Sequence, residues 1–327
     1  MLMASILESA HMGHLKDVVF DHYGRRIATC AADEKARIQI YDQDESGAWI
    51  THKTWPAHEQ TINRLAWAHP RFGQILASCS DDTSLKIWEE QDTKAGTLWK
   101  ERASISEQRP VKDISFCPPH LGLKIAVACT NGRVYIYEAH DVMNLSDWTL
   151  EKYFDAFSRP QVQQDIVSHP GVRTLSWNPS KFEAPMLVVG GNGDEQGYAL
   201  LRVFQYEDTT GEWRMLLELD SHGRHVNSVS WAPNMGRSYH LIASAGQDEH
   251  NQLKVHRIKR QPTGLQYEGS TCLRSADEPQ GIWRVAWNVT GTILASSADE
   301  GVVRLWKCNF KGDWNEIRAI GSAGFAD

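Results

Sequence analysis

The feature of this chain that most restricts its fold is a six-residue pattern that returns six times. Each copy has an apolar residue, two variable residues, an apolar residue, one variable residue and an aromatic residue, and the aromatic residues lie 47, 49, 61, 54 and 56 residues apart. The copies are Leu15-Val18-Phe20, Ile62-Leu65-Trp67, Val111-Ile114-Phe116, Val172-Leu175-Trp177, Val226-Val229-Trp231 and Ile282-Val285-Trp287. A repeat of this period is typical of stacked or radial supersecondary units. Because six such units fill nearly all of the 327 residues, we expect one repeat-built domain.

Each unit continues with three further segments that have the pattern of strands. A short apolar run comes next, as at residues 75–78, and a third run alternates apolar and polar residues, as at 85–88. A turn containing glycine then often leads into a fourth run that begins with tryptophan, as at Trp49. Continuous apolar runs and period-two alternation both indicate strands. Four strands in each of six units predict an all-β propeller, which we place at residues 14–320, with an N-terminal strand in 1–13 and a tail in 321–327.

The composition of the chain restricts which partners it can bind and in which cellular compartment it is expected. The net charge of −7 argues against a broad phosphate-binding surface, so we expect no nucleic acid partner. The six cysteines form no C-x-x-C pair, which fits reduced thiols in the nucleus or cytosol. The first residues lack a signal-peptide pattern and no apolar run is long enough to span a bilayer, so we expect no membrane insertion.

No motif for catalysis, cofactor binding or metal binding stands out. Gly191-Asn192-Gly193 lies between two strands, whereas a bound phosphate needs a helix N-terminus after such a loop. His11, His14 and His22 are close in sequence but have no cysteine pair beside them. We therefore expect no enzyme activity, cofactor or metal ion. A ligand-binding or enzymatic propeller that uses its central channel is a less favoured alternative, which titratable groups with perturbed pKa values at the channel mouth would support.

The units resemble WD repeats, and the second unit matches best. His58 precedes its first strand, Ser78 lies in the second, Asp82 lies in the tight turn and Trp88 closes the third. In that family such residues form a hydrogen-bonded network that locks the loops to the strands, so the resemblance implies a structural network here. The fifth unit has His256 where an aromatic residue is usual. We expect the units that depart from the pattern to depend more on apolar packing.

The strand count leaves a surplus at the seam between the two ends of the repeat. The last unit already has four candidate strands, so the apolar stretch at residues 3–10 has no obvious place. Unpaired sheet edges recruit other chains, so one hypothesis is an open ring in which a partner supplies strands between the first and last units. The other is a closed ring with a disordered tail, and the residues alone do not decide. The candidate partner-binding residues at the seam are Ile6, Leu7, Leu15, Val18, Ile282 and Val285.

Longer stretches resemble a particular family. Residues 67–80 look like the second-blade segment shared by the Sec-thirteen coat protein and its nucleoporin homologues, and 137–148, 232–238 and 283–307 are more similar to the nucleoporin homologues. The similarity runs from about residue 14 to 314, with departures mainly in 154–172 and 257–280. The chain therefore resembles the WD-repeat scaffold nucleoporins of the Sec-thirteen-homologue type.

This resemblance implies a structural scaffold subunit of the Y-shaped coat complex of the nuclear pore, which supports transport of protein and mRNA. Members of the family are six-bladed open propellers, and a helical-solenoid nucleoporin inserts a blade that completes the ring. Further nucleoporins of the Y-complex are implied as partners. The family also serves in a coat-like complex on the vacuolar or lysosomal membrane surface that regulates TOR signalling. With the resemblance added, we favour the open ring.

A vesicle-coat subunit at the endoplasmic reticulum, the Sec-thirteen role, is the alternative within the same architecture. It implies a different solenoid partner, so identification of the proteins that co-purify with the chain distinguishes the two roles.

Overall fold

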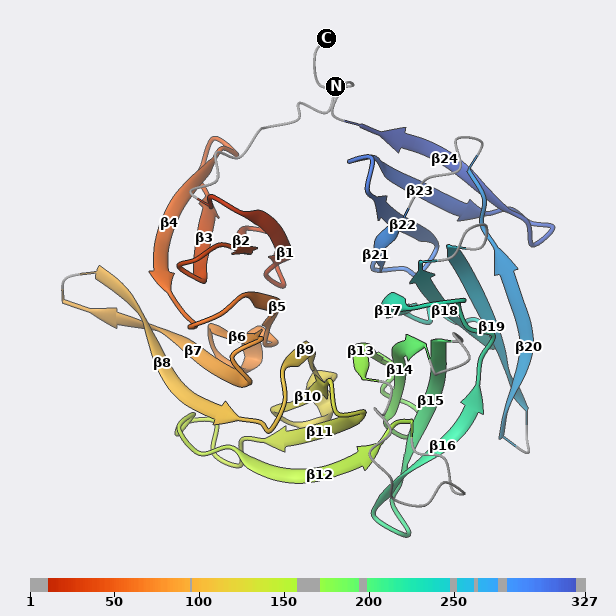
Figure 1. Cartoon of the computed structure of the whole chain (residues 1–327), viewed down its shortest axis with the longest axis horizontal. Coiled ribbons are helices and arrows are strands. Elements are labelled where there is room, and N and C mark those ends of the chain that lie inside the picture. Colours follow the sequence, from red (N-terminus) through yellow and green to blue (C-terminus); the bar gives the residue numbers. More distant parts are fainter. Residues whose placement is uncertain are drawn as a thin grey trace. The chain divides into compact units, whose positions relative to one another are not determined.

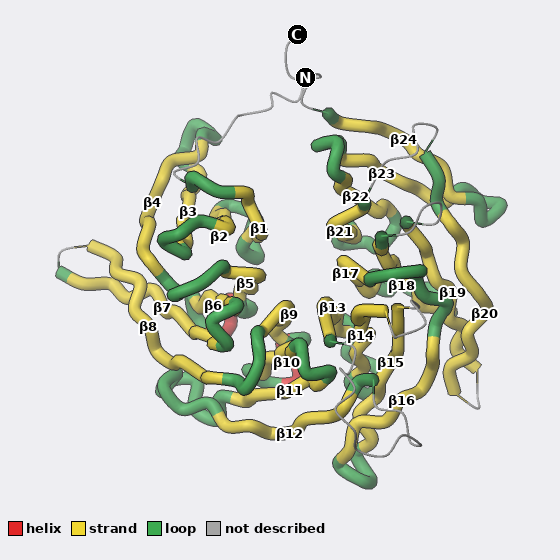
Figure 2. The backbone as a smooth tube through the Cα atoms, viewed as in Figure 1, coloured by secondary structure: helices red, strands yellow, loops and turns green. Residues whose placement is uncertain are grey.

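The structure, a computed structural model, describes residues 11–94, 96–157, 171–193, 199–247, 252–261, 264–275 and 281–321. Within these ranges the chain forms 24 strands and two short 3-10 helices (Figures 1 and 2). The strands make six four-stranded antiparallel sheets, each built from four strands that are consecutive along the chain. We call these sheets blades 1 to 6. They confirm the prediction of an all-β chain with six blades, which is the β-propeller fold class.

The bounds of the strands follow the predicted runs closely. Blades 1 to 3 contain β1 (His14–Phe20), β2 (Arg26–Ala32), β3 (Arg37–Gln43), β4 (Trp49–Pro56), β5 (Ile62–Trp67), β6 (Ile75–Ser80), β7 (Ser84–Thr93), β8 (Gly96–Ser106), β9 (Val111–Phe116), β10 (Lys124–Cys129), β11 (Arg133–Glu138) and β12 (Thr149–Asp155). Blades 4 to 6 contain β13 (Val172–Trp177), β14 (Met186–Gly193), β15 (Ala199–Glu207), β16 (Glu212–Glu218), β17 (Val226–Trp231), β18 (Tyr239–Gly246), β19 (Leu253–Gln261), β20 (Gly264–Cys272), β21 (Ile282–Trp287), β22 (Ile293–Ala298), β23 (Val303–Cys308) and β24 (Trp314–Ile320). The helices η1 (Pro70–Phe72) and η2 (Pro119–Leu121) join the first two strands of blades 2 and 3.

The chain divides into two compact units. The first comprises Met1–Thr130 and Tyr135–Tyr153, and the second comprises Asn131–Val134 and Phe154–Asp327, so the boundary passes through blade 3. In the first unit β1 contacts β5 and β5 contacts β9, and in the second β13 contacts β17 and β17 contacts β21. Within each unit, the first strands of successive blades therefore lie side by side (Figure 1).

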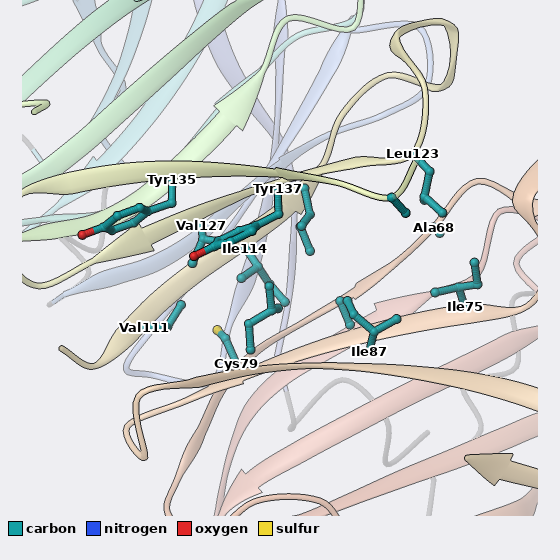
Figure 3. Close-up of a cluster of buried hydrophobic side chains, with 14 of the residues drawn as sticks. Ala68, Ile75, Cys79, Ile87, Val111, Ile114, Leu123, Val127, Tyr135 and Tyr137 are labelled. Carbon is teal, nitrogen blue, oxygen red and sulfur yellow. The ribbon is translucent and has the colours of Figure 1, made fainter. Parts of the chain in front are cut away.

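Apolar side chains packed between neighbouring blades form the core. In the first unit, Ile38 and Ile40 of blade 1 belong to one buried cluster with Ile62 and Leu65 of blade 2. A second cluster joins blade 2 to blade 3 (Figure 3). In the second unit, comparable clusters join blade 4 to blade 5 and blade 5 to blade 6. A blade between two neighbours is buried on both faces, which is why all six residues of β6 are buried and why the second strands are continuous apolar runs.

A polar chain crosses the interior of blade 2. The Trp88 indole Nε1–H donates to Ser78 Oγ (2.9 Å), and Ser78 Oγ lies 2.7 Å from His58 Nε2. The other ring nitrogen of His58, Nδ1, lies 2.9 Å from Asp82 Oδ2, which as a carboxylate can only accept. Burial alone would raise the pKa of Asp82, but the hydrogen bonds from His58 and Ser84 hold it below its ordinary value. The four residues predicted for the structural network thus lie on one continuous set of hydrogen bonds.

Blade 5 carries a longer polar chain, although its sequence indicates mainly apolar packing. His222 Nε2 lies 2.9 Å from Ser244 Oγ, and Ser244 Oγ lies 2.8 Å from His256 Nε2, so this imidazole takes the place of the usual indole. His256 Nδ1 is 3.1 Å from the Tyr267 hydroxyl, which donates to Asp220 Oδ2 (2.9 Å). Complete burial lowers the pKa of His256 well below its ordinary value, so the ring is neutral and can join the chain without a buried charge.

Blade 1 uses a different histidine from the one that its sequence suggests. Gly13-His14 has the order of residues found in WD repeats, but His14 is the first residue of β1. His11 instead lies with Nε2 2.9 Å from Thr29 Oγ1 and Nδ1 3.7 Å from Asp33 Oδ2. The network histidine of this blade therefore lies three residues upstream of His14. Of the N-terminal strand predicted in residues 1–13, only residues 11–13 are described, and they form no strand.

Replacing Trp88 by alanine removes a buried indole and its hydrogen bond to Ser78. We expect the Trp88→Ala variant to lose about 3–5 kcal/mol in the free energy of unfolding. The measurement is equilibrium urea unfolding followed by circular dichroism. Phe310→Ala, at a side chain that is 95% exposed, is the matched control and should change the free energy by less than about 0.5 kcal/mol. Equal stability of the two variants would contradict this account of the network.

The lowered pKa of Asp82 makes part of the stability dependent on pH. A carboxyl group whose pKa is lower in the folded chain stabilises the fold above its unfolded pKa, about 3.9, and loses that contribution as the pH falls further. The difference in unfolding free energy between the wild type and Asp82→Asn should therefore be constant from pH 7 to pH 5 and shrink below about pH 3.9. Urea unfolding at pH 7, 5 and 3.5 measures it. A difference that grows in acid would show that the sign is wrong.

Candidate partner-binding faces of the first and last blades

A β-bulge lies at the same place in the first strand of every blade. The pairing of the first strand with the second shifts just after the first apolar residue of the six-residue pattern. Such a bulge bends the strand and changes the direction of the side chain that follows. We call the residue after the bulge, two places beyond the first apolar residue, the junction residue. The six junction residues are Asp17, Arg64, Asp113, Thr174, Ser228 and Arg284.

Four of the six junction residues bond to the following blade. In three blades the junction side chain accepts a hydrogen bond from a backbone N–H on the first strand of the next blade. These bonds run from Leu65 N–H to Asp17 Oδ2 (2.9 Å), from Val229 N–H to Thr174 Oγ1 (3.2 Å) and from Val285 N–H to Ser228 Oγ (3.3 Å). They satisfy buried N–H groups that would otherwise have no water to bond.

Arginine at the junction position produces a different contact. Arg64 cannot accept a hydrogen bond, and its Nε instead lies 2.9 Å from Oδ1 of Asp113, the junction residue of blade 3. The N–H of Ile114 then donates to Asp113 Oδ1 in its own strand (2.9 Å). Burial alone would lower the pKa of Arg64, but the charges of Asp113 and Asp17 hold it above its ordinary value. An arginine junction residue is therefore matched by a carboxylate in the next blade.

The first strand of blade 1 leaves apolar side chains exposed. Leu15 and Val18 are 52% and 46% exposed, whereas their equivalents in blade 2, Ile62 and Leu65, are 0% and 3% exposed. Ile62 and Leu65 pack against blade 1, the blade that precedes theirs. The exposed face of blade 1 is thus the face that a preceding blade covers elsewhere. We call Leu15, Val18 and the exposed Phe20 the first-blade face.

The last blade leaves its opposite face partly exposed. Val303 of β23 is 37% exposed, whereas its equivalents Leu85 in blade 2 and Leu253 in blade 5 are completely buried. Those two equivalents pack against the blades that follow theirs. Leu305 and Ala295, paired across β22 and β23, are half-buried on this side of the sheet. We call Ala295, Val303 and Leu305 the last-blade face.

The seam residues predicted from the sequence fall into three groups. Ile6 and Leu7 lie outside the described residues. Leu15 and Val18 lie on the first-blade face. Ile282 and Val285 are buried in the cluster between blades 5 and 6, so they already face a neighbour. The sequence reasoning took the first strand of blade 6 for its free face. A comparison of the apolar–polar alternation in β23 with that in the equivalent strand β7 would have identified Val303 and Leu305 as residues of the free face.

Other candidate sites from the sequence have structural explanations. Gly191 lies in β14, where a Cβ would come within 2.3 Å of the Phe157 ring, so close packing explains this glycine. Among the residues that the structure describes, no group of three or more His, Cys, Asp or Glu side chains is placed to hold a metal ion. In the same part of the chain, no helix has the length and apolar character needed to cross a membrane.

Comparison with known proteins shows which family the chain resembles. Residues 49–89 and 270–307 match the family described as WD domain, G-beta repeat. Nucleoporin SEH1-A of Xenopus laevis is 35% identical over 337 residues, which cover 99% of this chain and 90% of that protein. Nucleoporin SEH1 of Homo sapiens is 36% identical over 327 residues, which cover 96% of this chain and 87% of that protein. Nucleoporin SEH1 of Danio rerio is 35% identical, with coverages of 96% and 86%.

The two WD matches lie on structural units already described. The first runs from β4 to β7 and so includes the first three strands of blade 2, and the second runs from β20 to β23 and includes those of blade 6. The similarity to the nucleoporins extends over nearly the whole chain, as the stretches quoted from the sequence indicate. With two WD matches among its six four-stranded blades and this identity over nearly its whole length, the chain belongs to the SEH1 nucleoporin family.

Proposed function

We propose that this chain is a structural scaffold subunit of the nuclear pore complex, within its Y-shaped coat. Membership in the SEH1 nucleoporin family supports the assignment to the pore. The single observation that supports a scaffold role is the pair of exposed apolar faces on the first and last blades, whose equivalents in blades 2 and 5 are packed against neighbouring blades. An exposed apolar sheet face of this kind is a surface for another polypeptide.

The partner in this proposal is a helical-solenoid nucleoporin that inserts a blade between blades 6 and 1, so that the ring is open in the isolated chain. The inserted strands would cover Leu15 and Val18 on one side and Val303 and Leu305 on the other, as neighbouring blades do within each unit. Covering two sheet faces and adding strands should bury well above roughly 2,000 Å² in total, the range of obligate interfaces.

The proposed location is the nuclear pore at the nuclear envelope, with other Y-complex nucleoporins as further partners. A second assembly, a coat-like complex on the vacuolar or lysosomal surface that regulates TOR signalling, belongs to the same proposal, since one seam can accept equivalent blades from different solenoids. Neither role requires a catalytic group, cofactor or metal ion.

Affinity purification of the chain, tagged at its own locus, tests the function. We expect stoichiometric recovery of a helical nucleoporin together with other pore subunits, and recovery of the vacuolar or lysosomal complex in a separate fraction. Gel filtration followed by mass spectrometry identifies the members of each complex. Recovery of the elongated vesicle-coat subunit in place of pore subunits would overturn the nuclear-pore assignment, and recovery of the chain as a monomer would overturn the scaffold role.

Lysine substitutions on the two exposed faces test the seam. Val18→Lys and Val303→Lys each place an ammonium group where the inserted blade would bury it without a partner, so each should weaken binding of the co-purified solenoid at least about tenfold. Val289→Lys is the matched control because Val289 is 87% exposed in the turn between β21 and β22. Biolayer interferometry measures the affinities, and circular dichroism checks that the variants fold. Equal affinities of all three variants would exclude these faces from the interface.

A further inference from the structure

We propose that Arg284 recognises an aspartate on the first strand of the blade that the partner inserts after blade 6. This inference rests on the proposed function and adds a chemical requirement to the partner. The site is one side chain of blade 6, the junction residue that follows the bulge of β21. The recognised group is a carboxylate at the equivalent place in the incoming strand.

The position of Arg284 is the first argument. It stands two places after Ile282, where Asp17, Arg64, Thr174 and Ser228 stand in their own blades. Each of those four side chains bonds to the next blade along the chain. The same bulge precedes Arg284, so this residue occupies the strand position from which the other four reach the following blade.

The chemistry of the side chain is the second argument. A guanidinium donates hydrogen bonds and accepts none, so Arg284 cannot bond the backbone N–H of an incoming strand as Thr174 and Ser228 do for theirs. Blade 2 presents the same situation, because its junction residue Arg64 meets Asp113 at the junction position of blade 3. By analogy with this pair, arginine in blade 6 favours a carboxylate at the junction position of the next blade.

Aspartate fits this place better than glutamate. Asp113 Oδ1 accepts both from Arg64 Nε and from the N–H of the next residue in its own strand, each at 2.9 Å. The short side chain allows this double role, since it lets the carboxylate bond to the adjacent N–H while it faces the arginine. An incoming strand that meets Arg284 likewise has two donors to satisfy, the guanidinium and the N–H of the residue after its own junction position.

Burial supports the assignment. Arg284 is only half-buried, whereas Arg64, which has a following blade, is buried. Arg284 makes a contact within its own chain, and the incoming carboxylate would be added to that contact. Covering the guanidinium with a blade removes water from it, which makes a matched carboxylate more favourable and a missing one more costly.

The neighbouring residue makes Arg284 important for register. In blades 2 and 5 the bulged residue is asparagine, and its side-chain amide donates to a carbonyl of the next blade, from Asn63 to Val111 O (2.8 Å) and from Asn227 to Ile282 O (3.0 Å). In blade 6 this residue is Trp283, whose indole N–H donates to Asp299 of its own blade. The charged pair at Arg284 would then be the main polar contact that fixes how the incoming strand aligns.

Charge reversal with a matched control tests the inference. The probe is the helical partner recovered with the tagged wild-type chain and then produced recombinantly. Arg284→Glu should weaken its binding at least about thirtyfold, and Arg284→Ala at least about tenfold, because each leaves the partner's carboxylate buried without a cation. Arg214→Glu, on the outer strand β16 where Arg214 is half-exposed and pairs with Glu207, is the control and should bind as the wild type does.

Identification of the carboxylate is the second arm of the test. Arg284→Lys keeps the positive charge and supplies an amine that a carbodiimide can link to a carboxylate in contact with it. We expect a cross-link to an aspartate in the inserted blade, and exchange of that aspartate for arginine should restore binding to Arg284→Glu.

The outcomes separate the two proposals. If the wild type binds its helical partner but Arg284→Glu binds as tightly as Arg214→Glu, or the cross-links stay within this chain, the inference about Arg284 is wrong while the scaffold function stands. If the wild type recovers no helical partner, the proposed function fails and the inference fails with it.

Discussion

Burial of both faces of each blade against its neighbours is the constraint on which the rest of the structure depends. A four-stranded sheet with apolar residues on both faces cannot cover them by itself, so its stability comes from the blades beside it. Leu85 of blade 2 and Leu253 of blade 5 are completely buried only because another blade follows them in the chain. In the part of the chain that the structure describes, no further blade precedes the first or follows the last, and Val18 and Val303 are exposed on the corresponding faces.

Polar contacts fix the register between neighbouring blades, which apolar packing alone does not determine. Apolar faces tolerate sliding, whereas a bulge followed by a junction residue allows one register, because the hydroxyl of Thr174 or Ser228 must meet a particular N–H. The ion pair of Arg64 with Asp113 costs more desolvation than those neutral bonds. The ion pair is also more selective, because an arginine junction residue favours a carboxylate in the next blade and disfavours an apolar side chain there. The order of blades along the chain is thus supported by specific pairs as well as by burial.

Local patterns predicted the blades, and non-local contacts decided what the sequence reasoning missed. The apolar run ending at Ser78 and the alternation ending at Trp88 are local, so both strands could be predicted from the residues, and the resemblance to WD repeats added the network of blade 2. The network histidine of blade 1 was missed because only the fold shows that His11 reaches Thr29. His256 was taken for a defect because its place in a chain with Ser244 depends on a neighbouring strand. The free face of blade 6 was assigned to the wrong strand because a sequence does not show on which side of a sheet the preceding blade lies.

The apolar faces and junction residues that align neighbouring blades within the chain would also select a partner, if a partner supplies the next blade. Apolar area at the seam would supply affinity, but any sheet with an apolar face offers that, so area alone cannot choose among partners. A junction arginine adds discrimination, because an incoming strand with a hydrophobic or basic residue at that position would add no carboxylate to the contact that Arg284 makes within its own chain. One scaffold can then serve more than one assembly if each solenoid carries the same short strand with its carboxylate. Under this proposal the rest of the partner would be free to differ, since only the inserted blade would meet the two exposed faces.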